Sequence, residues 1–319
     1  MRLAIAICVV ALLACGARVF LKVAPIGARY ANAEKYTAGG AELDGPVKNL
    51  DIDWTDGSVS IAYHAKNTVG ISETAPKAIS GDEAMRWWLD GDTLRIRYAK
   101  SGSFSLLGLF SSRGQNKALT VTLPEGLALG DVDIDVTSGD VSVPQLRADS
   151  VKIDLTSGDL ALRQSGVSER VELSSTSGDI TADVAEVGRL DVSITSGRIR
   201  TTMGSGDEVS LSTTSGDISL DGGSANRTRI DSTSGKIDVA LAEFDDLQIE
   251  ATSGDIAVAL PSRPGYRADI DTTSGSFDST VALAREGRSY SCGDGSAGVR
   301  IDTTSGNVRL TDVNGRNGQ

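Results

Sequence analysis

Residues 211–218, Leu-Ser-Thr-Thr-Ser-Gly-Asp-Ile, contain a turn motif that recurs along this chain of 319 residues. Thr-Ser-Gly occurs nine times, and successive glycines are 19 to 21 residues apart except for a last interval of 31 residues. A constant period near 20 residues is typical of a solenoid, in which each repeat forms one coil that stacks on the next. The turn glycines are Gly139, Gly158, Gly178, Gly197, Gly216, Gly235, Gly254, Gly275 and Gly306.

Apolar residues stand at fixed distances from each turn glycine. The fifth residue before the glycine is Ile, Leu or Val in every copy, and the second residue after it is aliphatic except for Phe277. Because alternate residues of a strand share a face, both positions point inward only if the chain turns a corner between them. Thr-Ser-Gly-Asp supplies this corner, since Gly accepts a positive φ and Ser and Asp can bond to nearby backbone. The pattern predicts an all-β protein, a parallel β-solenoid (β-helix) of about nine to ten coils of 19–20 residues.

The N-terminal part carries a weaker copy of the same pattern. Leu50, Ile52 and Trp54 precede Gly57 at the offsets of the repeats, which predicts a divergent first coil. We expect residues 34–130 to form an N-terminal β cap that contains this coil, because an exposed terminal coil invites edge pairing.

Within the cap, two short alternating segments predict strands. Residues 94–98 and 119–123 are interpreted as the two strands of a hairpin, and Trp87 and Trp88 as part of the core of the cap.

The remainder of the chain is assigned to the repeats. Residues 131–313 are expected to form the Thr-Ser-Gly solenoid, with an insertion over roughly 281–295 before the final coil. Residues 314–319 are expected to be a tail.

An uncharged, mostly apolar segment lies near the N-terminus. Residues 3–17 are too few for a membrane-spanning helix of about 20 residues but suit the apolar part of a secretion signal. The sequence from Leu12 to Cys15 resembles the cleavage box of lipoproteins, so Cys15 is a candidate for lipidation. We expect residues 1–33 to be a signal peptide or membrane anchor. The protein is then exported, contacts a membrane through its N-terminus, and belongs to the cell surface or envelope.

The flanking charges favour a different interpretation. Only Arg2 precedes the apolar segment, whereas Arg18, Lys22, Arg29 and Lys35 follow it, opposite to the usual bias of exported proteins. The alternative is a buried N-terminal helix of a cytosolic protein. A lipid anchor, a transmembrane helix and a cleaved signal all stay open.

The composition excludes several classes of function. The chain has one histidine, His64, and three cysteines, so it lacks the residues for a zinc cluster, a disulfide framework or a Ser-His-Asp triad elsewhere. The net charge is −12, and residues 131–319 carry 17 basic against 31 acidic residues. Nucleic acid is therefore not expected as a partner, because the excess acid repels phosphates. We predict no cofactor and no catalytic residue.

A column of aspartates follows the turn glycines. Calcium could lie between stacked carboxylates, but the glycine-rich calcium motif of other solenoids is missing, and Arg198 and Lys236 interrupt the column. Turn hydrogen bonding is the favoured role. The candidates for a metal are Asp140, Asp159, Asp179, Asp217 and Asp255.

A second acidic column lies four residues before the turn glycine. On a rigid coil such a stripe would attract a cationic peptide, an envelope polymer or a protein partner, although it would also serve simply as a solvated face. The residues of this possible binding face are Asp135, Asp154, Asp231, Glu250, Asp271 and Asp302.

Two further features have no assigned role. The apolar segment Phe104–Phe110 either contacts a membrane or partner or folds back over the cap. Cys292 is either a free thiol or a residue that pairs between chains.

These residues resemble a bacterial putative adhesin family, a domain of unknown function with β-strand repeats and recurrent Thr-Ser-Gly-Asp turns. The resemblance covers about residues 46–312. Its motifs are the opening at Ile52-Asp53-Trp54 with Gly57, the strand 119–124, and Gly293-Asp294-Gly295-Ser296. It implies a surface or envelope protein and supplies no catalytic motif.

Three classes of function follow from the sequence. The first is a non-enzymatic cell-surface or envelope protein that presents a rigid acidic solenoid face for binding. The second is a cytosolic or membrane-associated assembly scaffold. The third is a carbohydrate-active β-helix enzyme, because β-solenoids can carry pairs of carboxylates that cleave glycosidic bonds. The periodic placement of the carboxylates argues against the enzyme, since they form no irregular cluster.

Overall fold

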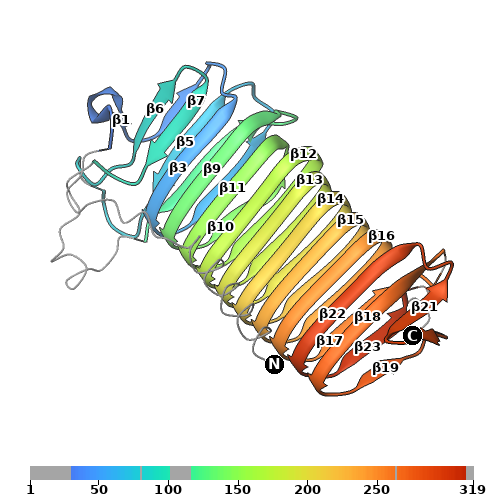
Figure 1. The fold of residues 1–319 in the computed structure, drawn as a ribbon. Helices are drawn as coiled ribbons and strands as arrows, with labels where there is room; N and C mark the ends of the chain where they lie inside the picture. The colour runs from blue at the N-terminus through green and yellow to red at the C-terminus, as the bar shows by residue number, and fades with distance from the viewer. Residues whose placement is uncertain (1–29, 80, 101–115, 263, 314–319) are drawn as a thin grey trace. The chain divides into compact units, whose positions relative to one another are not determined.

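A computed structural model describes residues 30–79, 81–100, 116–262 and 264–313. Cys15, the segment Phe104–Phe110 and the tail 314–319 lie outside the described residues, so the predictions about them are not addressed by the structure. The contacts divide the chain into two compact units, a first unit up to Ser168 and a second unit from Glu169 onward. Figure 1 shows that β-strands dominate both units. No helix in the described ranges has the length and apolarity needed to cross a membrane.

The first unit begins with one turn of 3-10 helix, Ala33–Lys35, and continues as strands. These are β1 (Thr37–Ala38), β2 (Ala41–Leu43), β3 (Asn49–Asp56), β4 (Val59–His64), β5 (Val69–Thr74), β6 (Arg86–Asp90), β7 (Thr93–Arg97), β8 (Ala118–Pro124), β9 (Leu129–Ser138), β10 (Val141–Leu146), β11 (Ala148–Ser157) and β12 (Leu160–Ser177), which continues into the second unit.

The second unit contains the remaining strands. These are β13 (Ile180–Ser196), β14 (Ile199–Ser215), β15 (Ile218–Ser234), β16 (Ile237–Ser253), β17 (Ile256–Leu260), β18 (Gly265–Ser274), β19 (Phe277–Ser279), β20 (Ala284–Glu286), β21 (Ser289–Gly293), β22 (Ala297–Ser305) and β23 (Val308–Asp312).

The strands β13 to β16 are consecutive coils of a parallel β-solenoid, as the repeat predicts. Each runs from one Thr-Ser-Gly turn to the next, and neighbouring strands pair in parallel with a shift of one repeat, so that Ile199 faces Ile218 and Ile218 faces Ile237. Leu211 and Ile230, from the column before the turn, are likewise fully buried. Each such side chain contributes roughly 1.5–3 kcal/mol through its removal from water.

The turn glycines hold the corner through both conformation and packing. All nine have positive φ values, between 122° and 152°. A Cβ atom added at Gly216 would lie 1.7 Å from the carbonyl oxygen of Gly197 in the preceding coil. Backbone therefore stacks directly on backbone along this edge, and no side chain fits between the coils.

Coils at the end of the second unit stack in an order that differs from the order of the sequence. β22 pairs in parallel with β16 on one side and with β18 on the other, and β23 likewise lies between β17 and β19 (Figure 1). The last coil of the chain, at Gly306, is thus inserted between those of Gly254 and Gly275. The Gly275 coil becomes the outermost one, and its Ile270 and Phe277 are only half-buried.

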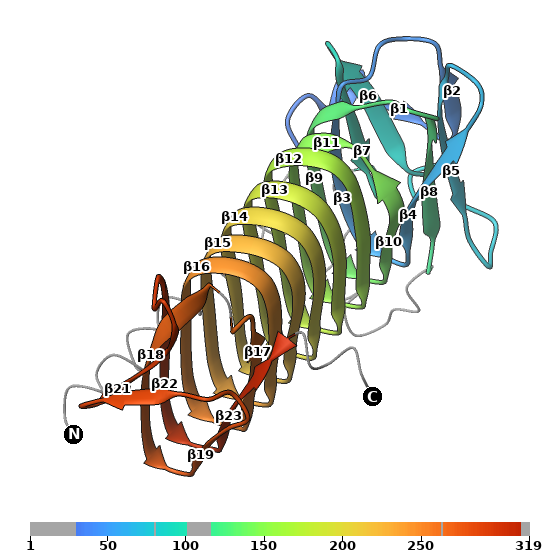
Figure 2. The ribbon, with the colours of Figure 1, turned by 90° about the vertical axis from the view of Figure 1, so that its right-hand side faces the viewer.

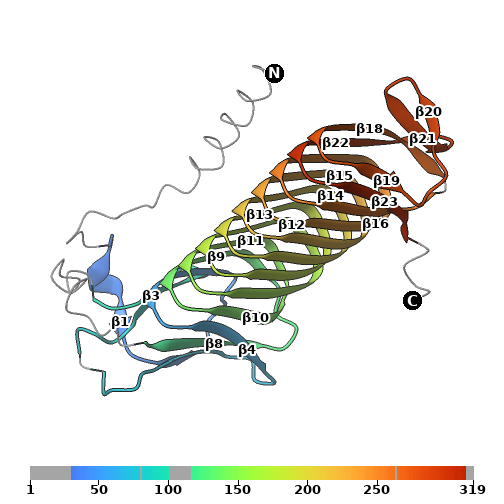
Figure 3. The same ribbon diagram turned by 90° about the horizontal axis from the view of Figure 1, so that it is seen from below.

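The insertion predicted near residues 281–295 contains the strands that cover this outermost coil. β20 and β21 form an antiparallel hairpin, and β21 also pairs with β18 from Gly265 to Asp269 (Figure 3). The ring centroids of Tyr290 and Phe277 are 4.9 Å apart. The hairpin therefore satisfies part of an edge that would otherwise be open to pairing with another chain.

The first unit shows the same exchange of coils at its own end. β3 and β4 form the divergent coil around Gly57 and stack on β9 and β10. β7 and β8 do not form the expected hairpin, because β7 pairs in parallel with β3 and β8 with β4. They are the two arms of a further coil, and the antiparallel strands β6 and β5 cover them (Figure 2). Sequence spacing did not reveal this coil because its corner lacks the Thr-Ser-Gly signature.

Lys117 stands at the corner of this outer coil and is fully buried. Its Nζ lies 3.0 Å from Oε2 of Glu73, donates to the carbonyl of Glu83 at 2.7 Å, and also donates to that of Tyr98. The ammonium group lies 3.9 Å from the ring centroid of Tyr98 and 5.1 Å from that of Trp54. Burial lowers the pKa of Lys117, while hydrogen bonding to Glu73 opposes that shift. A buried ion pair inside an aromatic cage thus lies at the centre of this end of the unit.

Trp54, rather than the predicted tryptophan pair, is the aromatic centre of that core. Trp54 is fully buried, and its indole N–H donates to the carbonyl of Lys117 at 3.2 Å. Trp87 and Trp88 are half-buried on β6. Trp88 packs edge-to-face on Tyr36 with ring centroids 5.6 Å apart.

We predict that Gly216→Ala lowers the free energy of unfolding by about 3 kcal/mol or more, because the methyl group meets backbone and the φ value is unfavourable. Thermal unfolding followed by circular dichroism measures the change. Gly81→Ala is the control, since a methyl group there meets nothing within 4 Å. Equal melting of the Gly216→Ala variant and the wild type would contradict the stacked-corner structure.

Lys117→Met should lower the free energy of unfolding by about 3–5 kcal/mol, because it leaves the buried carboxylate of Glu73 without its partner. The double variant Lys117→Met/Glu73→Gln should recover much of this loss, since Gln still accepts the hydrogen bond that Met85 N donates to Oε1 of Glu73. Urea unfolding of the two variants tests the pair. A double variant no more stable than the single one would show that the charge of Glu73 is not the cause.

Candidate functional site

The aspartates after the turn glycines join neighbouring coils. The backbone N–H of Asp159 donates to Oδ1 of Asp140 at 2.9 Å, and that of Lys236 donates to Asp217 at the same distance. Asp179 receives the N–H of Arg198 and Asp255 that of Asn307, also at 2.9 Å. Each of these bonds uses a backbone N–H of the neighbouring coil, which is why a cation can follow the glycine in alternate coils. The side chains of Arg198 and Asn307 add further contacts to the same aspartates.

This arrangement favours turn hydrogen bonding over calcium binding for the aspartate column. Each of these four carboxylates has at least one oxygen engaged by a backbone N–H of the next coil. Within the part of the chain that the structure describes, no three His, Cys, Asp or Glu side chains gather in a geometry that could hold a metal ion.

The acidic column four residues before the turn is in register on the second unit. Asp231 faces Glu250, Glu250 faces Asp302, and Asp302 faces Asp271. The exchanged coils bring Glu250 beside Asp302, which lies 52 residues away in the sequence, instead of beside Asp271. We call the outward surface formed by the residues four, six and eight positions before the turn glycines the charged face.

Arginines from the neighbouring columns interleave with these carboxylates. Arg229 forms two hydrogen bonds with Asp231, both 2.9 Å, and its Nη2 lies 3.1 Å from Oε1 of Glu250. Arg300 pairs with Asp302 at 2.7 Å. The charged face therefore carries both signs of charge and differs from the purely acidic stripe expected from one column. The prediction missed these cations because it considered a single position of the repeat.

The charged face of the first unit contains a denser group of acids. Asp53, Asp135 and Asp154 form one row across β3, β9 and β11. The neighbouring row contains Asp51 and Asp133, and then Lys152.

Cations bind only part of this group. Two arginines from β7 hold Asp51, with Nη1 of Arg97 2.7 Å from Oδ1 and a closer contact from Arg95. Lys152 contacts Asp154 at the other side. Asp135 stands between the two groups of ion pairs.

The environment of Asp135 favours its protonated form. Partial withdrawal from water raises its pKa to about 6, and the negative charges of Asp133, Asp154 and Asp53 contribute, while Lys152 opposes the shift. Burial also raises the pKa of Asp53. A carboxyl group with a raised pKa is thus set in a row of other carboxylates.

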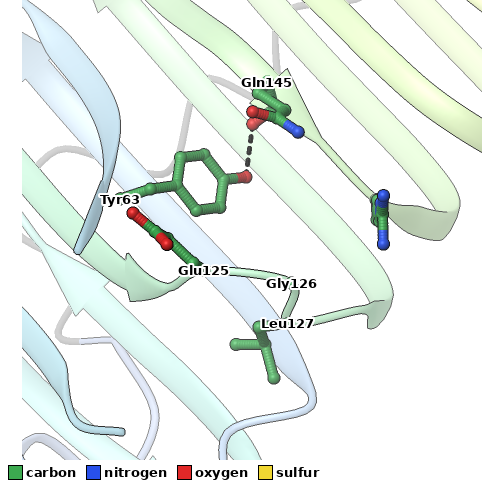
Figure 4. A pocket seen from close by; sticks show the side chains of 6 residues that line it. Tyr63, Glu125, Gly126, Leu127 and Gln145 are labelled. Atoms are coloured by element: carbon green, nitrogen blue, oxygen red, sulfur yellow. Dashed lines mark hydrogen bonds between the residues drawn. The ribbon is translucent and has the colours of Figure 1, made fainter. Parts of the chain in front are cut away.

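A pocket of about 260 Å³ opens in the first unit where β4 and β10 separate (Figure 4). The two strands pair at Val59 with Val141 and at Ser60 with Ser142, and the ladder then ends. The N–H of Val141 donates to the carbonyl of Asp159, on the side away from β4. Because the N–H groups of a strand point to alternate sides, that of residue 144 would point toward β4. Residue 144 is proline, which has no hydrogen to donate. The residues that line the pocket are Tyr63, Glu125, Gly126, Leu127, Gln145 and Arg147.

Tyr63 bridges β4 and β10 at the point where the two strands diverge. Its hydroxyl donates to the backbone carbonyl of Gln145 (Figure 4), and burial raises the pKa of the phenol to about 12, so it stays protonated. This pocket was not predicted from the sequence. Its one signal was Pro144 inside a strand, because proline cannot continue a central ladder.

Cys292 is a buried free thiol that contacts the carbonyl of Ser262 at 3.4 Å. Burial raises the pKa of its thiol, and the charge of Asp312 acts in the same direction.

In-register parallel coils, stacked through glycine corners, define a β-solenoid protein. Residues 47–311 match the family described as Toastrack DUF4097, a domain of unknown function. The chain belongs to this family, which agrees with the resemblance found from the sequence.

Comparison with solved structures gives distant likenesses. A putative cell adhesion protein from Clostridium sporogenes shares 14% identity, with a TM-score of 0.22 over 86% of this chain and 100% of that chain. A putative adhesin from Bacteroides fragilis shares 9% identity, with a TM-score of 0.41 over 86% and 97%. These scores carry no argument about function. No curated protein matches the chain.

We predict that Asp135→Asn raises the melting temperature at pH 7.5, by on the order of 1–2 °C, and has a smaller effect at pH 4. The folded state holds the proton of Asp135 more tightly than the unfolded chain. Binding of this proton therefore stabilises the folded state fully below about pH 4, and this stabilisation is lost as the pH rises through about 6. Asp149→Asn, at an exposed position outside this acidic group, is the control for the substitution itself. An equal effect of Asp135→Asn at both pH values would contradict the raised pKa of Asp135.

Proposed function

We propose that this chain is a non-enzymatic cell-surface or envelope protein of the adhesin type, whose solenoid presents the charged face for binding. The observation that carries the proposal is the strict register of that face. Charged side chains of both signs recur at the same positions of the repeat, as Arg229 with Asp231 on β15 and Arg300 with Asp302 on β22 do, with β16 between these two strands. We infer that the face recognises a partner with a repeating pattern of charge, and an envelope polymer is the first candidate.

The stiffness of the coils supports a binding role. Parallel strands lie about 4.8 Å apart, so charges on successive coils form a lattice with a fixed spacing. Backbone ladders and the aspartate bonds at the corners keep these spacings constant. A surface that is ordered before binding loses little conformational entropy when the partner binds.

The location of the protein is inferred from its N-terminus. The uncharged segment 3–17 suits a secretion signal or an anchor. An exported solenoid of this kind would meet envelope polymers, cationic peptides and other surface proteins, all of which present charges that the face can pair.

Most carboxylates of the charged face are already engaged, which supports a binding rather than a catalytic role. Asp231, Glu250 and Asp302 each contact an arginine. Asp135 is the residue on which an enzymatic alternative would depend, because glycosidases use one carboxyl with a raised pKa beside an ionised one. The alternative therefore requires that Asp135→Asn abolish cleavage of a polysaccharide.

The test measures binding of the full-length chain to isolated bacterial envelopes in a sedimentation assay. Arg229→Gln/Arg300→Gln should change the affinity at least fivefold, and the wild-type affinity should fall as salt shortens the screening length. Arg288→Gln/Arg309→Gln removes the same charge from exposed sites outside the face and should behave as the wild type. Equal binding by all three proteins would contradict the proposed role of the face, and release of reducing ends would contradict a non-enzymatic role.

Protease treatment of intact cells tests the location. A C-terminal epitope on the full chain should be lost from intact cells, or from spheroplasts if an outer membrane shields it, while a cytosolic control protein survives. Protection in both preparations would contradict export.

A further inference from the structure

We propose that the pocket at Tyr63 binds one neutral sugar unit of an envelope glycan. This inference rests on the proposed function, because it names a substrate class for the same envelope partner. It concerns a site separate from the charged face, formed where β4 and β10 diverge.

The pocket has a fixed aromatic wall. The hydroxyl of Tyr63 is engaged by the carbonyl of Gln145, which holds the ring in place and leaves the ring itself half-exposed (Figure 4). Leu127, also half-buried, provides a second apolar surface. An aromatic ring held in this way packs against the C–H face of a pyranose, which is apolar, and needs no reorganisation to do so.

Three polar side chains around this wall have unused hydrogen-bonding capacity. Glu125, Gln145 and Arg147 are exposed, and among the described residues their side chains form no hydrogen bond or ion pair. The carboxylate only accepts hydrogen bonds, the guanidinium only donates them, and the amide does both. The hydroxyl groups of a sugar both donate and accept, so a single sugar ring satisfies all three groups.

The size and charge of the pocket favour a neutral ring over an ion. Its volume of about 260 Å³ is below the ~300–1,000 Å³ of pockets that enclose a drug-sized ligand, so it holds one ring while the rest of a chain extends outside. One carboxylate and one guanidinium cancel in net charge. Recognition here therefore depends on hydrogen bonds and ring packing, and we expect it to be insensitive to salt, unlike binding at the charged face.

The test titrates the full-length chain with neutral tetrasaccharides, the N-acetylglucosamine tetramer and the glucose tetramer, by calorimetry and saturation-transfer NMR. One of them should bind with an affinity that is the same in low and high salt. Glu125→Gln, Gln145→Ala and Tyr63→Leu should each lower this affinity, by at least tenfold in the Tyr63 variant. Arg309→Gln is the control at an exposed arginine outside the pocket, and melting curves confirm that each variant is folded.

Several results would overturn the inference. They are no binding of either tetrasaccharide at millimolar concentration, binding that the three variants leave unchanged, or selective binding of an alanine dipeptide that requires both Glu125 and Arg147. If envelopes bind to the chain but the pocket variants bind the tetrasaccharides as the wild type does, the sugar site is wrong and the proposed function stands. If envelopes do not bind, the proposed function is wrong, and the tetrasaccharide titration still decides the pocket.

Discussion

The close stacking of backbone on backbone at the glycine corners is the constraint on which the rest of the structure depends. At Gly216 and its counterparts, the carbonyl of the preceding coil occupies the space that a Cβ atom would need. The corner is therefore restricted to glycine in every coil with a Thr-Ser-Gly turn, and its position fixes where each of these strands begins and ends. Because the corners coincide, the columns before and after them are brought into register, and the aliphatic interior follows from that register.

The same register explains how the surface is organised. A side chain that stands at one position of the repeat meets the side chain at that position in the next coil, so charges form columns rather than isolated pairs. Like charges in a column repel, and arginines from the adjacent columns relieve the repulsion. Where such relief is incomplete, as at Asp135, the carboxyl group takes up a proton more readily. The electrostatics of the charged face is thus a consequence of the corner.

The outermost coil of each unit is covered in a similar way. In each unit the outermost coil is not the one that comes last or first in the sequence, and antiparallel strands lie against it. Antiparallel strands at the edge interrupt the repeat and cover open hydrogen-bonding groups. At the N-terminal end, the buried pair of Lys117 and Glu73 replaces the glycine corner and fixes the outer coil to its neighbours.

The repeat spacing, the alternation of apolar residues and the glycine corner were readable from the sequence, because each is a pattern in the linear order of the residues and does not depend on which coils are neighbours in space. They determined the solenoid, the buried columns and the hydrogen-bonding role of aspartates such as Asp217. Which coil lies beside which was decided only by the tertiary structure. The coils at Gly275 and Gly306 carry nearly the same motif, so sequence cannot rank them as neighbours of Gly254. The pocket at Tyr63 likewise arises where two strands from distant parts of the chain diverge, a spacing that no local pattern encodes.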